Sequence, residues 1–116
     1  MLRFIAPLPV FVAPVFASGD CETKREIYID NSSTKVWKTT LCPQQRLPFH
    51  THDFARVLIP EEAGKLKVTY RSGKVRWVNL EAKKPIFLSK RQGAESHQDL
   101  NPGNQVLHLT LIELKG

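Results

Sequence analysis

The stretch RLPFHTHDFARVLIP, residues 46–60, contains the pattern on which the fold prediction depends. Its first part has a proline, as in a turn, followed by His50 and His52. Its second part, residues 54–59, is rich in branched and apolar side chains and predicts a β-strand. Residues two apart in extended backbone point to the same face, so the two imidazoles can share one metal ion. By itself the pattern leaves two interpretations open, a metal site and a turn with two exposed histidines.

The N-terminus predicts an export signal. One early cation, Arg3, precedes an uncharged apolar run from Phe4 to Ala17, which ends in the small and branched residues that a signal peptidase recognises. The run is short for a bilayer span and contains three prolines. We therefore predict a signal peptide over residues 1–17 and a mature domain over residues 18–116, secreted or periplasmic and free of the membrane after cleavage. An N-terminal membrane anchor is the alternative.

Both cysteines, Cys21 and Cys42, fall in the predicted mature domain. An even number of cysteines in an exported chain favours a disulfide. If residues 25–30 and 34–42 form an antiparallel hairpin over Asn31 and Ser32, the two cysteines lie opposite each other, close enough for an S–S bond. We predict a structural disulfide between them, with two free buried thiols as the alternative. The chain has no CxxC motif that would suggest redox chemistry.

The rest of the chain is a succession of short strands without a helical period. Ser72 and Gly73 are typical of a two-residue hairpin loop, and glycines and prolines mark the other gaps. Short strands at regular spacing predict a sandwich or barrel, so the expected fold is a single all-β domain. We expect Trp37, Trp77 and Phe87 in its core. The predicted strands are residues 25–30, 35–41, 54–59, 65–71, 74–80, 85–89 and 105–114.

The positive charge of the chain is spread along it. There are 17 lysines and arginines against 11 acidic residues, a net charge of +6, and most of the cations alternate with apolar residues. This is the pattern of outward strand faces and loops, not of a concentrated basic stripe with interleaved aromatics. We therefore predict no nucleic-acid partner. No glycine-rich phosphate loop and no Ser-His-Asp or Cys-His signature is found in the sequence, so no catalytic residue is predicted.

A second cluster of polar residues completes a larger pattern. Residues 93–103, GAESHQDLNPG, contain His97, then Asn101 four residues later and Gly103 just before the last predicted strand. Together with the first histidine pair, this arrangement resembles the two sequence motifs of the cupin family, the first over residues 42–70 and the second over residues 89–114. The resemblance spans roughly residues 27–114. It implies a small single-domain cupin, which is a jelly-roll barrel.

The resemblance also implies a metal site. In cupins the two histidines of the first motif, a glutamate and the histidine of the second motif bind one divalent metal inside the barrel. Carried over, His50, His52 and His97 are the metal ligands, and the implied cofactor is a single divalent transition metal such as Zn, Fe, Mn, Ni or Cu. The glutamate is missing, because Arg56 and Val57 stand at the matching positions. Arginine has no lone pair for a metal, so the first motif is degenerate.

Three roles for Arg56 stay open at this point. It can line a metal-free polar pocket with the histidines, it can hold the carboxylate of a small ligand together with a metal, or it can turn outward to solvent. Phe54 shares its strand face by parity and is predicted to contact the same ligand. The second motif implies ligand binding for Asn101. In the last strand the face that carries Leu107, Leu109 and Leu111 is expected to be buried, which places His108 outside.

Three functions compete on this evidence. The first is an exported barrel that binds a small polar or anionic ligand, either directly or through a metal held by three histidines. The second is a metal-dependent enzyme of the dioxygenase or isomerase type, and the third is a non-catalytic scaffold domain. The missing glutamate favours the first over the second, because an iron site with two histidines and one carboxylate lacks its carboxylate. Whether the protein is an enzyme stays open. A homodimer is possible, since cupins often pair through sheet edges.

Overall fold

A computed structural model describes residues 20–116 of the protein. The predicted signal peptide, residues 1–17, lies outside the described residues. Eight strands and one short helix make up the described part, which confirms the all-β prediction. The elements are β1 (Lys24–Asp30), β2 (Thr34–Leu41), β3 (Ala55–Pro60), β4 (Gly64–Tyr70), β5 (Val75–Leu80), β6 (Ile86–Leu88), α2 (Lys90–Ala94), β7 (His97–Leu100) and β8 (Leu107–Leu114).

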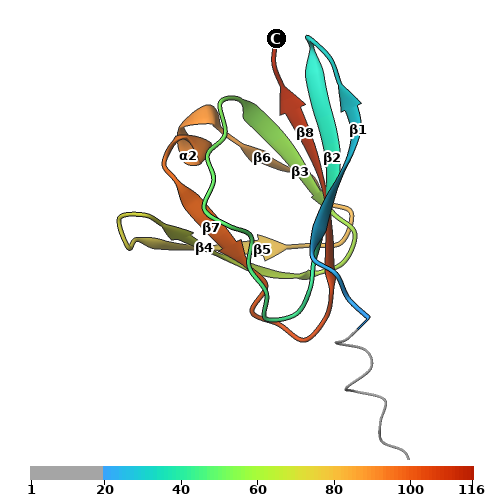
Figure 1. The fold of residues 1–116 in the computed structure, drawn as a ribbon, viewed down its shortest axis with the longest axis vertical. Coiled ribbons are helices and arrows are strands. Elements are labelled where there is room, and N and C mark those ends of the chain that lie inside the picture. Colours follow the sequence, from blue (N-terminus) through green and yellow to red (C-terminus); the bar gives the residue numbers. More distant parts are fainter. Residues whose placement is uncertain (1–19) are drawn as a thin grey trace, which may run out of the picture.

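The strands form two antiparallel sheets that face each other (Figure 1). The larger sheet has the order β1-β2-β8-β3-β6, and the smaller one has the order β5-β4-β7. Residues alternate between the two faces of each strand, and one face of each sheet is buried against the other sheet. As predicted, the leucines of β8 are buried and His108 is on the outer face. The core consists of Trp37, Leu41, Leu58, Leu66, Val68, Tyr70, Val78, Leu80, Leu88, Leu107, Leu109 and Leu111.

Two of the three aromatics that were expected in the core are exposed. Trp37 is buried, but Trp77 is 55% exposed and Phe87 is 62% exposed. The cause is strand parity, because Val78 in β5 and Leu88 in β6 take the inward positions next to them. The position of a residue in the alternation of its strand therefore predicts burial better than its aromatic character does.

The β1–β2 hairpin has a different register from the predicted one. Asp30 lies opposite Lys35, not opposite Ser33, and a bulge shifts the register between Ile27 and Ile29. The longer loop forms because the side chain of Asn31 accepts hydrogen bonds from the backbone N–H groups of two following residues, each at 2.9 Å. Beyond the bulge, towards the open end of the hairpin, the pairing of the two strands is closer to the predicted register.

The disulfide between Cys21 and Cys42 is nevertheless formed, as predicted, with the two Cα atoms 5.9 Å apart. Cys42 is buried at the end of β2, so the bridge anchors the start of the described chain to the larger sheet. Such bridges are typical of proteins in oxidising, exported compartments. Within residues 20–116 no helix is long and apolar enough to cross a membrane.

Four residues, Arg71–Lys74, separate β4 from β5, and the three that precede Lys74 form the hairpin loop, where two were predicted. The backbone N–H of Tyr70 donates to the carbonyl of Lys74 and closes the loop at 2.8 Å. Gly73 has a φ of 93°, which a residue with a side chain rarely adopts. The glycine therefore closes the hairpin as expected, in a loop one residue longer.

Two elements near the second histidine motif were not predicted. Helix α2 has only five residues, too few to show a helical period, and begins at a capping box between Ser89 and Gln92. Strand β7 has the sequence HQDL, without the branched residues that indicate a strand, and forms through its pairing with β4. Both elements lie beside the histidines and shape the site.

Removal of the disulfide is expected to destabilise the domain. We predict that the double variant Cys21→Ala/Cys42→Ala loses about 2–4 kcal/mol of unfolding free energy, because its unfolded chain is no longer cross-linked. Urea denaturation followed by far-UV circular dichroism measures this change. A reductant should destabilise the wild-type protein in the same way and leave the double variant unaffected. Equal stability of wild type and double variant would contradict the prediction.

Candidate functional site

The backbone brings the two histidine motifs together. The first pair does not lie in a strand, because β3 begins only at Ala55; it lies in an extended segment that runs beside β7. His50 and His97 form a bridge in which each N–H donates to the carbonyl of the other, at 2.8 and 3.0 Å. The N–H of His52 donates to the carbonyl of Gly93 in α2 at 2.8 Å. The segment that carries His50 and His52 is thus hydrogen-bonded both to β7 and to α2.

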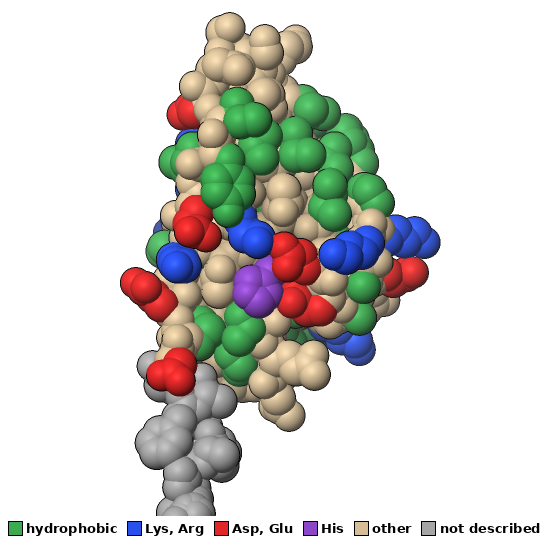
Figure 2. Space-filling model, turned by 90° about the vertical axis from the view of Figure 1, so that its right-hand side faces the viewer, with side chains coloured by type: hydrophobic (Ala, Val, Ile, Leu, Met, Phe, Trp, Pro, Cys, Tyr) green, Lys and Arg blue, Asp and Glu red, His purple; other side chains and the backbone are tan. Residues whose placement is uncertain are grey.

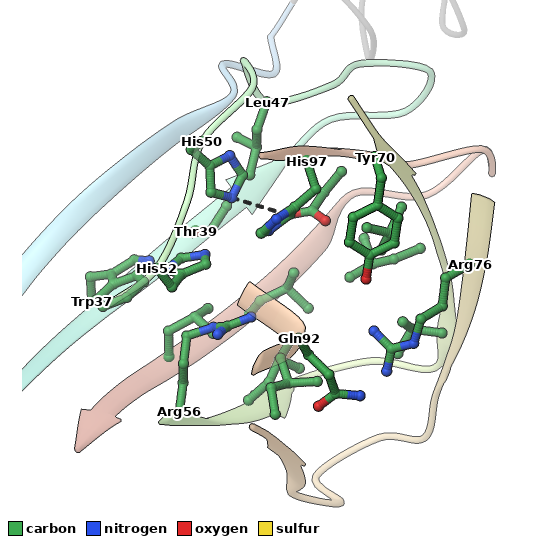
Figure 3. Close-up of a pocket in the computed structure, with 18 residues that line it drawn as sticks. Trp37, Thr39, Leu47, His50, His52, Arg56, Tyr70, Arg76, Gln92 and His97 are labelled. Atoms are coloured by element: carbon green, nitrogen blue, oxygen red, sulfur yellow. Dashed lines mark ion pairs between the residues drawn. The ribbon is translucent and has the colours of Figure 1, made fainter. Parts of the chain in front are cut away.

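The three histidine side chains form a compact cluster (Figure 3). The ring centroids of His50 and His97 are 4.5 Å apart, those of His50 and His52 are 4.9 Å apart, and those of His52 and His97 are 5.4 Å apart. Each ring offers a nitrogen, and these nitrogens all lie within 4.8 Å of one another. The predicted ligand residues are therefore brought together at a distance that one metal ion can bridge.

Backbone carbonyls orient two of the three rings. Nδ1 of His50 lies 2.7 Å from the carbonyl oxygen of Pro48, and Nδ1 of His97 lies 2.8 Å from that of Glu95. A carbonyl can only accept, so Nδ1 carries the proton in both rings and Nε2 keeps its lone pair. Metal-binding histidines in proteins are fixed in the same way by an acceptor on their other nitrogen.

The environment favours the uncharged form of His52 and of His97. Burial, together with the positive charge of Arg56, lowers the pKa of His52 to about 3. Burial also lowers the pKa of His97, against the opposing effect of its hydrogen bond to the Glu95 carbonyl. Neutral imidazoles are the form that binds metals, and three of them with an open fourth position suit zinc or a similar divalent ion. The residues present therefore fit a single transition metal.

Arg56 points into the barrel beside the histidines. Its side chain is only 5% exposed, which excludes the outward orientation. It comes from β3, where it is paired with Glu113 of β8, and burial lowers the pKa of its guanidinium, while the carboxylates of Asp99 and Glu113 counteract this. Its Nη1 atom is buried and has no hydrogen-bond partner. A buried N–H without an acceptor lowers the stability of the fold, because it has lost its hydrogen bonds to water and gains no hydrogen bond within the protein.

Helix α2 closes this side of the site through a glycine. Gly93 is buried against Arg56 and His52. A Cβ atom at this position would lie 2.6 Å from Nη1 of Arg56 and 2.8 Å from Cβ of His52, both inside van der Waals contact. Only glycine lets the helix approach so closely, so Gly93 fixes where the guanidinium and the imidazole can lie.

The histidines and Arg56 line a cavity of about 70 Å³ between the two sheets (Figure 3). Its remaining walls are mostly apolar. Sequence reasoning did not identify four of its polar residues, because they come from the smaller sheet and from α2, whose positions relative to the histidines are set by the tertiary fold. These four residues are Tyr70, Arg76, Gln92 and Asp99.

Two carboxylates lie close to the histidine cluster. The oxygen of Asp99 is 3.7 Å from Nε2 of His50, and that of Glu113 is 3.9 Å from Nδ1 of His52. Asp99 follows His97 by two residues in β7, so alternation would have placed it on the same face if the strand had been predicted. Glu113 shares the inner face of β8 with the leucines. The site therefore contains carboxylates, although not at the motif position.

Two predicted ligand contacts lie away from the cavity. Phe54 lines a second hollow, which His50 and His52 also line, and not the cavity between the sheets. The chain is irregular before β3, so strand parity does not extend to Phe54. Asn101 is 2% exposed and holds a loop. Its Nδ2 donates to the carbonyls of Leu41 and Gln105, and its Oδ1 accepts from the N–H of Gly103, all within 3.0 Å. With its amide group occupied, Asn101 has a structural role here and its predicted ligand contact has no geometric support.

The comparisons with known proteins identify the fold. No protein-family model and no curated protein matches the sequence. A cupin domain from Bordetella pertussis Tohama I matches in structure with a TM-score of 0.72 and 21% identity, over 81% of this chain and 94% of that one. An RmlC-like cupin family protein with a double-stranded β-helix fold from Methanocaldococcus jannaschii matches with a TM-score of 0.63 and 12% identity, over 82% and 83%.

A third similar structure is that of the polyketide cyclase RemF from Streptomyces resistomycificus. It has a TM-score of 0.58 and 16% identity, and the match covers 82% of this chain and 66% of that one. Together these likenesses establish that the described domain has the cupin fold, a double-stranded β-helix, as the sequence motifs predicted. More particularly, it is a small cupin barrel with three clustered histidines and with Arg56 in place of the motif glutamate.

Substitution of Gly93 tests how tightly α2 holds the site. We predict that Gly93→Ala costs about 1–3 kcal/mol of unfolding free energy, because the added methyl group displaces Arg56 or His52. Urea denaturation provides the measurement. Gly103→Ala is a matched control, since a Cβ there would meet only Oδ1 of Asn101 at an ordinary 3.5 Å. If both variants change stability equally, the close approach at Gly93 is not the cause.

Acidification is expected to destabilise the metal-free protein. A histidine of the unfolded chain takes up a proton near its ordinary pKa of 6.5, whereas His52 in the folded protein stays neutral down to about 3. Between these values the unfolded state binds more protons, so the contribution of His52 is complete above pH 6.5 and is lost as the pH falls towards 3. Urea denaturation across this range in the presence of a chelator measures the loss, which should be on the order of a few kcal/mol.

The variant His52→Gln separates this effect from the titration of carboxylates. Glutamine has no proton to gain, so the variant should lose less stability than the wild type over the same pH range. An identical pH dependence in the two proteins would mean that His52 does not contribute.

Proposed function

We propose that this protein binds a small anionic ligand inside its cupin barrel, with a divalent transition metal held by His50, His52 and His97 as part of the binding site. The observation that carries the proposal is the buried guanidinium of Arg56, whose Nη1 atom lacks a hydrogen-bond partner. A carboxylate is the acceptor that matches a guanidinium, because it can take two parallel N–H donors. The inward direction of Arg56 supports this function over ordinary metal chemistry.

The electrostatics of the cavity favour an anion. Arg56 and Arg76 both line it, and the side chains converge from opposite walls (Figure 3). The three histidines cannot balance the positive charge of the arginines, because an imidazole carries no negative charge. A bound divalent ion would add further positive charge beside Arg56. The carboxylates of Asp99 and Glu113 offset this charge in part. An anionic ligand between the metal and Arg56 would relieve the repulsion between the two cations.

The size of the cavity limits the ligand. A volume of about 70 Å³ holds on the order of five water molecules. This suits a compact mono- or dicarboxylate with a few heavy atoms, whose carboxylate meets Arg56 and whose remaining atoms face the leucines and valines of the wall. The mostly apolar lining strengthens each of the polar contacts by excluding water.

Export is part of the proposal. The disulfide and the predicted signal peptide over residues 1–17 both favour a secreted or periplasmic protein. In such a compartment the protein would meet its ligand outside the cytoplasm, and the disulfide would stay oxidised.

A metal-dependent enzyme is the second candidate. It is favoured by Asp99, whose carboxylate lies 3.7 Å from His50 and could supply the oxygen donor that the first motif lacks. Three histidines and one carboxylate would leave room for a substrate or water on a metal ion. A scaffold without ligand is less consistent with three clustered histidines and with a buried guanidinium whose Nη1 atom has no hydrogen-bond partner.

Metal analysis combined with ligand titration tests the proposal. We expect near-stoichiometric metal in the purified wild-type protein after dialysis against Zn²⁺, and its loss in His50→Ala and His97→Ala, measured by elemental analysis. We further expect oxalate to bind to the metal-loaded protein in isothermal titration calorimetry. Arg56→Met should weaken this binding by about tenfold or more, since it removes a charge-assisted bidentate contact.

Arg91→Met is the matched control. Arg91 is exposed on α2 and does not line the cavity, so this substitution removes the same charge from the protein without changing the cavity. Equal weakening by both arginine variants would mean that overall charge, not the site, attracts oxalate. Metal binding without any effect of Arg56→Met on small carboxylates would favour the enzyme. Wild-type protein that takes up no metal and binds no oxalate would refute the proposal.

A further inference from the structure

Arg76 is a charged residue on an inner face that is otherwise mostly apolar. It lies in β5, where Val78 and Leu80 take the next inward positions and are buried. In the pairing of β4 with β5 it is directly opposite Val68, which is 5% exposed. Residues that pair directly project from the same face. Arg76 therefore points from the smaller sheet into the space between the sheets, where it lines the cavity (Figure 3).

The two arginines that line the cavity have no ion-pair partner. Within residues 20–116 no carboxylate forms an ion pair with Arg56 or with Arg76. Cations on the outside of the protein are in water and also have acidic neighbours. Figure 2 shows lysines and arginines interspersed with acidic side chains on the face that it draws, and Nζ of Lys38 lies 2.9 Å from Glu61. The two inward arginines lack such a neighbour.

The one acidic residue that lines the described cavity does not reach Arg76. Asp99 and Arg76 both pair with Val68, from opposite sides of β4, so their backbones are two strand spacings apart, about 10 Å. The carboxylate of Asp99 lies 3.7 Å from Nε2 of His50, at the histidine end of the cavity. The cavity thus has an unpaired cation at the end away from the histidines.

The charges of Arg56 and Arg76 repel each other across the cavity. Burial is the main cause of the lowered pKa of Arg56, and the positive charge of Arg76 contributes in the same direction. Figure 3 shows the two guanidinium groups on opposite sides of the cavity. A divalent ion on the histidines would add further positive charge. A single carboxylate beside Arg56 would balance only part of this excess and would leave Arg76 without a partner.

Two uncharged hydrogen-bond donors lie near Arg76. Tyr70 is at the end of β4, and its hydroxyl points into the cavity on the side of Arg76 (Figure 3). Gln92 of α2 also lines the cavity. Its Oε1 accepts from the backbone N–H of Ser89 at 2.7 Å, so the two N–H groups on Nε2 remain for a ligand. A guanidinium with neighbouring donors is the complement of a carboxylate.

From this arrangement we propose that Arg76, Tyr70 and Gln92 form a second anion-binding subsite, and that the ligand of the protein is a dicarboxylate. One of its carboxylates binds at Arg56 beside the metal, and the other binds at Arg76. This inference rests on the proposed function and narrows the class of its ligand. Because the two arginines come from facing sheets, which pack about 10 Å apart, the two carboxylates must be separated by a spacer.

The wall of the cavity determines the kind of spacer. Apart from the polar groups already named, it consists mostly of leucines and valines from both sheets. Methylene groups can contact such a wall without burying a polar atom that lacks a partner. The volume of about 70 Å³ limits the spacer to one or two of them. Malonate and succinate have this form, whereas the two carboxylates of oxalate are joined directly and reach one end only.

Isothermal titration calorimetry on the metal-loaded protein tests the inference. Propionate and butyrate have the carbon chains of malonate and succinate but only one carboxylate. We expect the tighter-binding of the two dicarboxylates to bind at least about tenfold more tightly than its monocarboxylate counterpart. Arg76→Met should reduce this ratio to about two or less. It should change the affinity for oxalate by no more than about threefold, because a distant charge acts on oxalate only through space.

Lys65→Met is the matched control. Lys65 is exposed on the outer face of β4, so its substitution removes one positive charge from the same sheet without changing the cavity. It should leave the ratio between dicarboxylate and monocarboxylate unchanged. Elemental analysis should find the same metal content in Arg76→Met as in the wild type, which shows that the histidine site is still folded.

Two results would overturn the inference and leave the proposed function standing. The first is a wild-type protein that binds oxalate but binds propionate and butyrate as tightly as the dicarboxylates, a result that needs no variant. The second is a dicarboxylate preference that Arg76→Met leaves unchanged or that Lys65→Met lowers equally. Wild-type protein that binds none of these carboxylates, oxalate included, would refute the proposed function itself and this inference with it.

Discussion

The pair of backbone hydrogen bonds between His50 and His97 is the constraint on which the site depends. These bonds tie the segment between β2 and β3 to β7, which belongs to the smaller sheet, and so connect the two sheets at the point where the cavity lies. A bridge between backbones fixes side chains more firmly than contacts between flexible rings would. Because the same segment donates from His52 to the carbonyl of Gly93, its position also determines where α2 packs and how deeply Arg56 is covered.

Arg56 stands at the position where the resemblance to cupins implies a glutamate, and its guanidinium lies buried beside the three histidines. A glutamate would neutralise part of the charge of a divalent ion, whereas the guanidinium adds to it. The protein compensates only in part, through Glu113 across the strand pair and Asp99 on β7, and it leaves Nη1 without an acceptor. Buried charges without complete pairing are costly. The anionic ligand that we propose would complete the pairing of this guanidinium.

Local sequence patterns predicted the parts of this structure that rest on alternation and spacing. Two of the three roles left open for Arg56 required an inward side chain, and the side chain points inward in the structure. Parity failed at Phe54, because the chain there is not yet a strand. Strand β7 and the cavity residues Tyr70 and Asp99 could not be predicted, because a short polar segment forms a strand only when another strand pairs with it. The role of Asn101 depends on a loop closed by tertiary contacts and is equally invisible in the sequence.

Successive residues of each strand in the larger sheet point alternately to the cavity and to the outer surface. In β3 the inward residues Arg56 and Leu58 line the cavity, while Val57 between them faces outward. The same holds in β8, where Leu111 faces the cavity and Ile112 faces outward. A shift of β3 by one residue would place the guanidinium outside and an apolar side chain in its position. Site and outer surface are thus specified by one register, and the position of Arg56 depends on the pairing of β3 with β8.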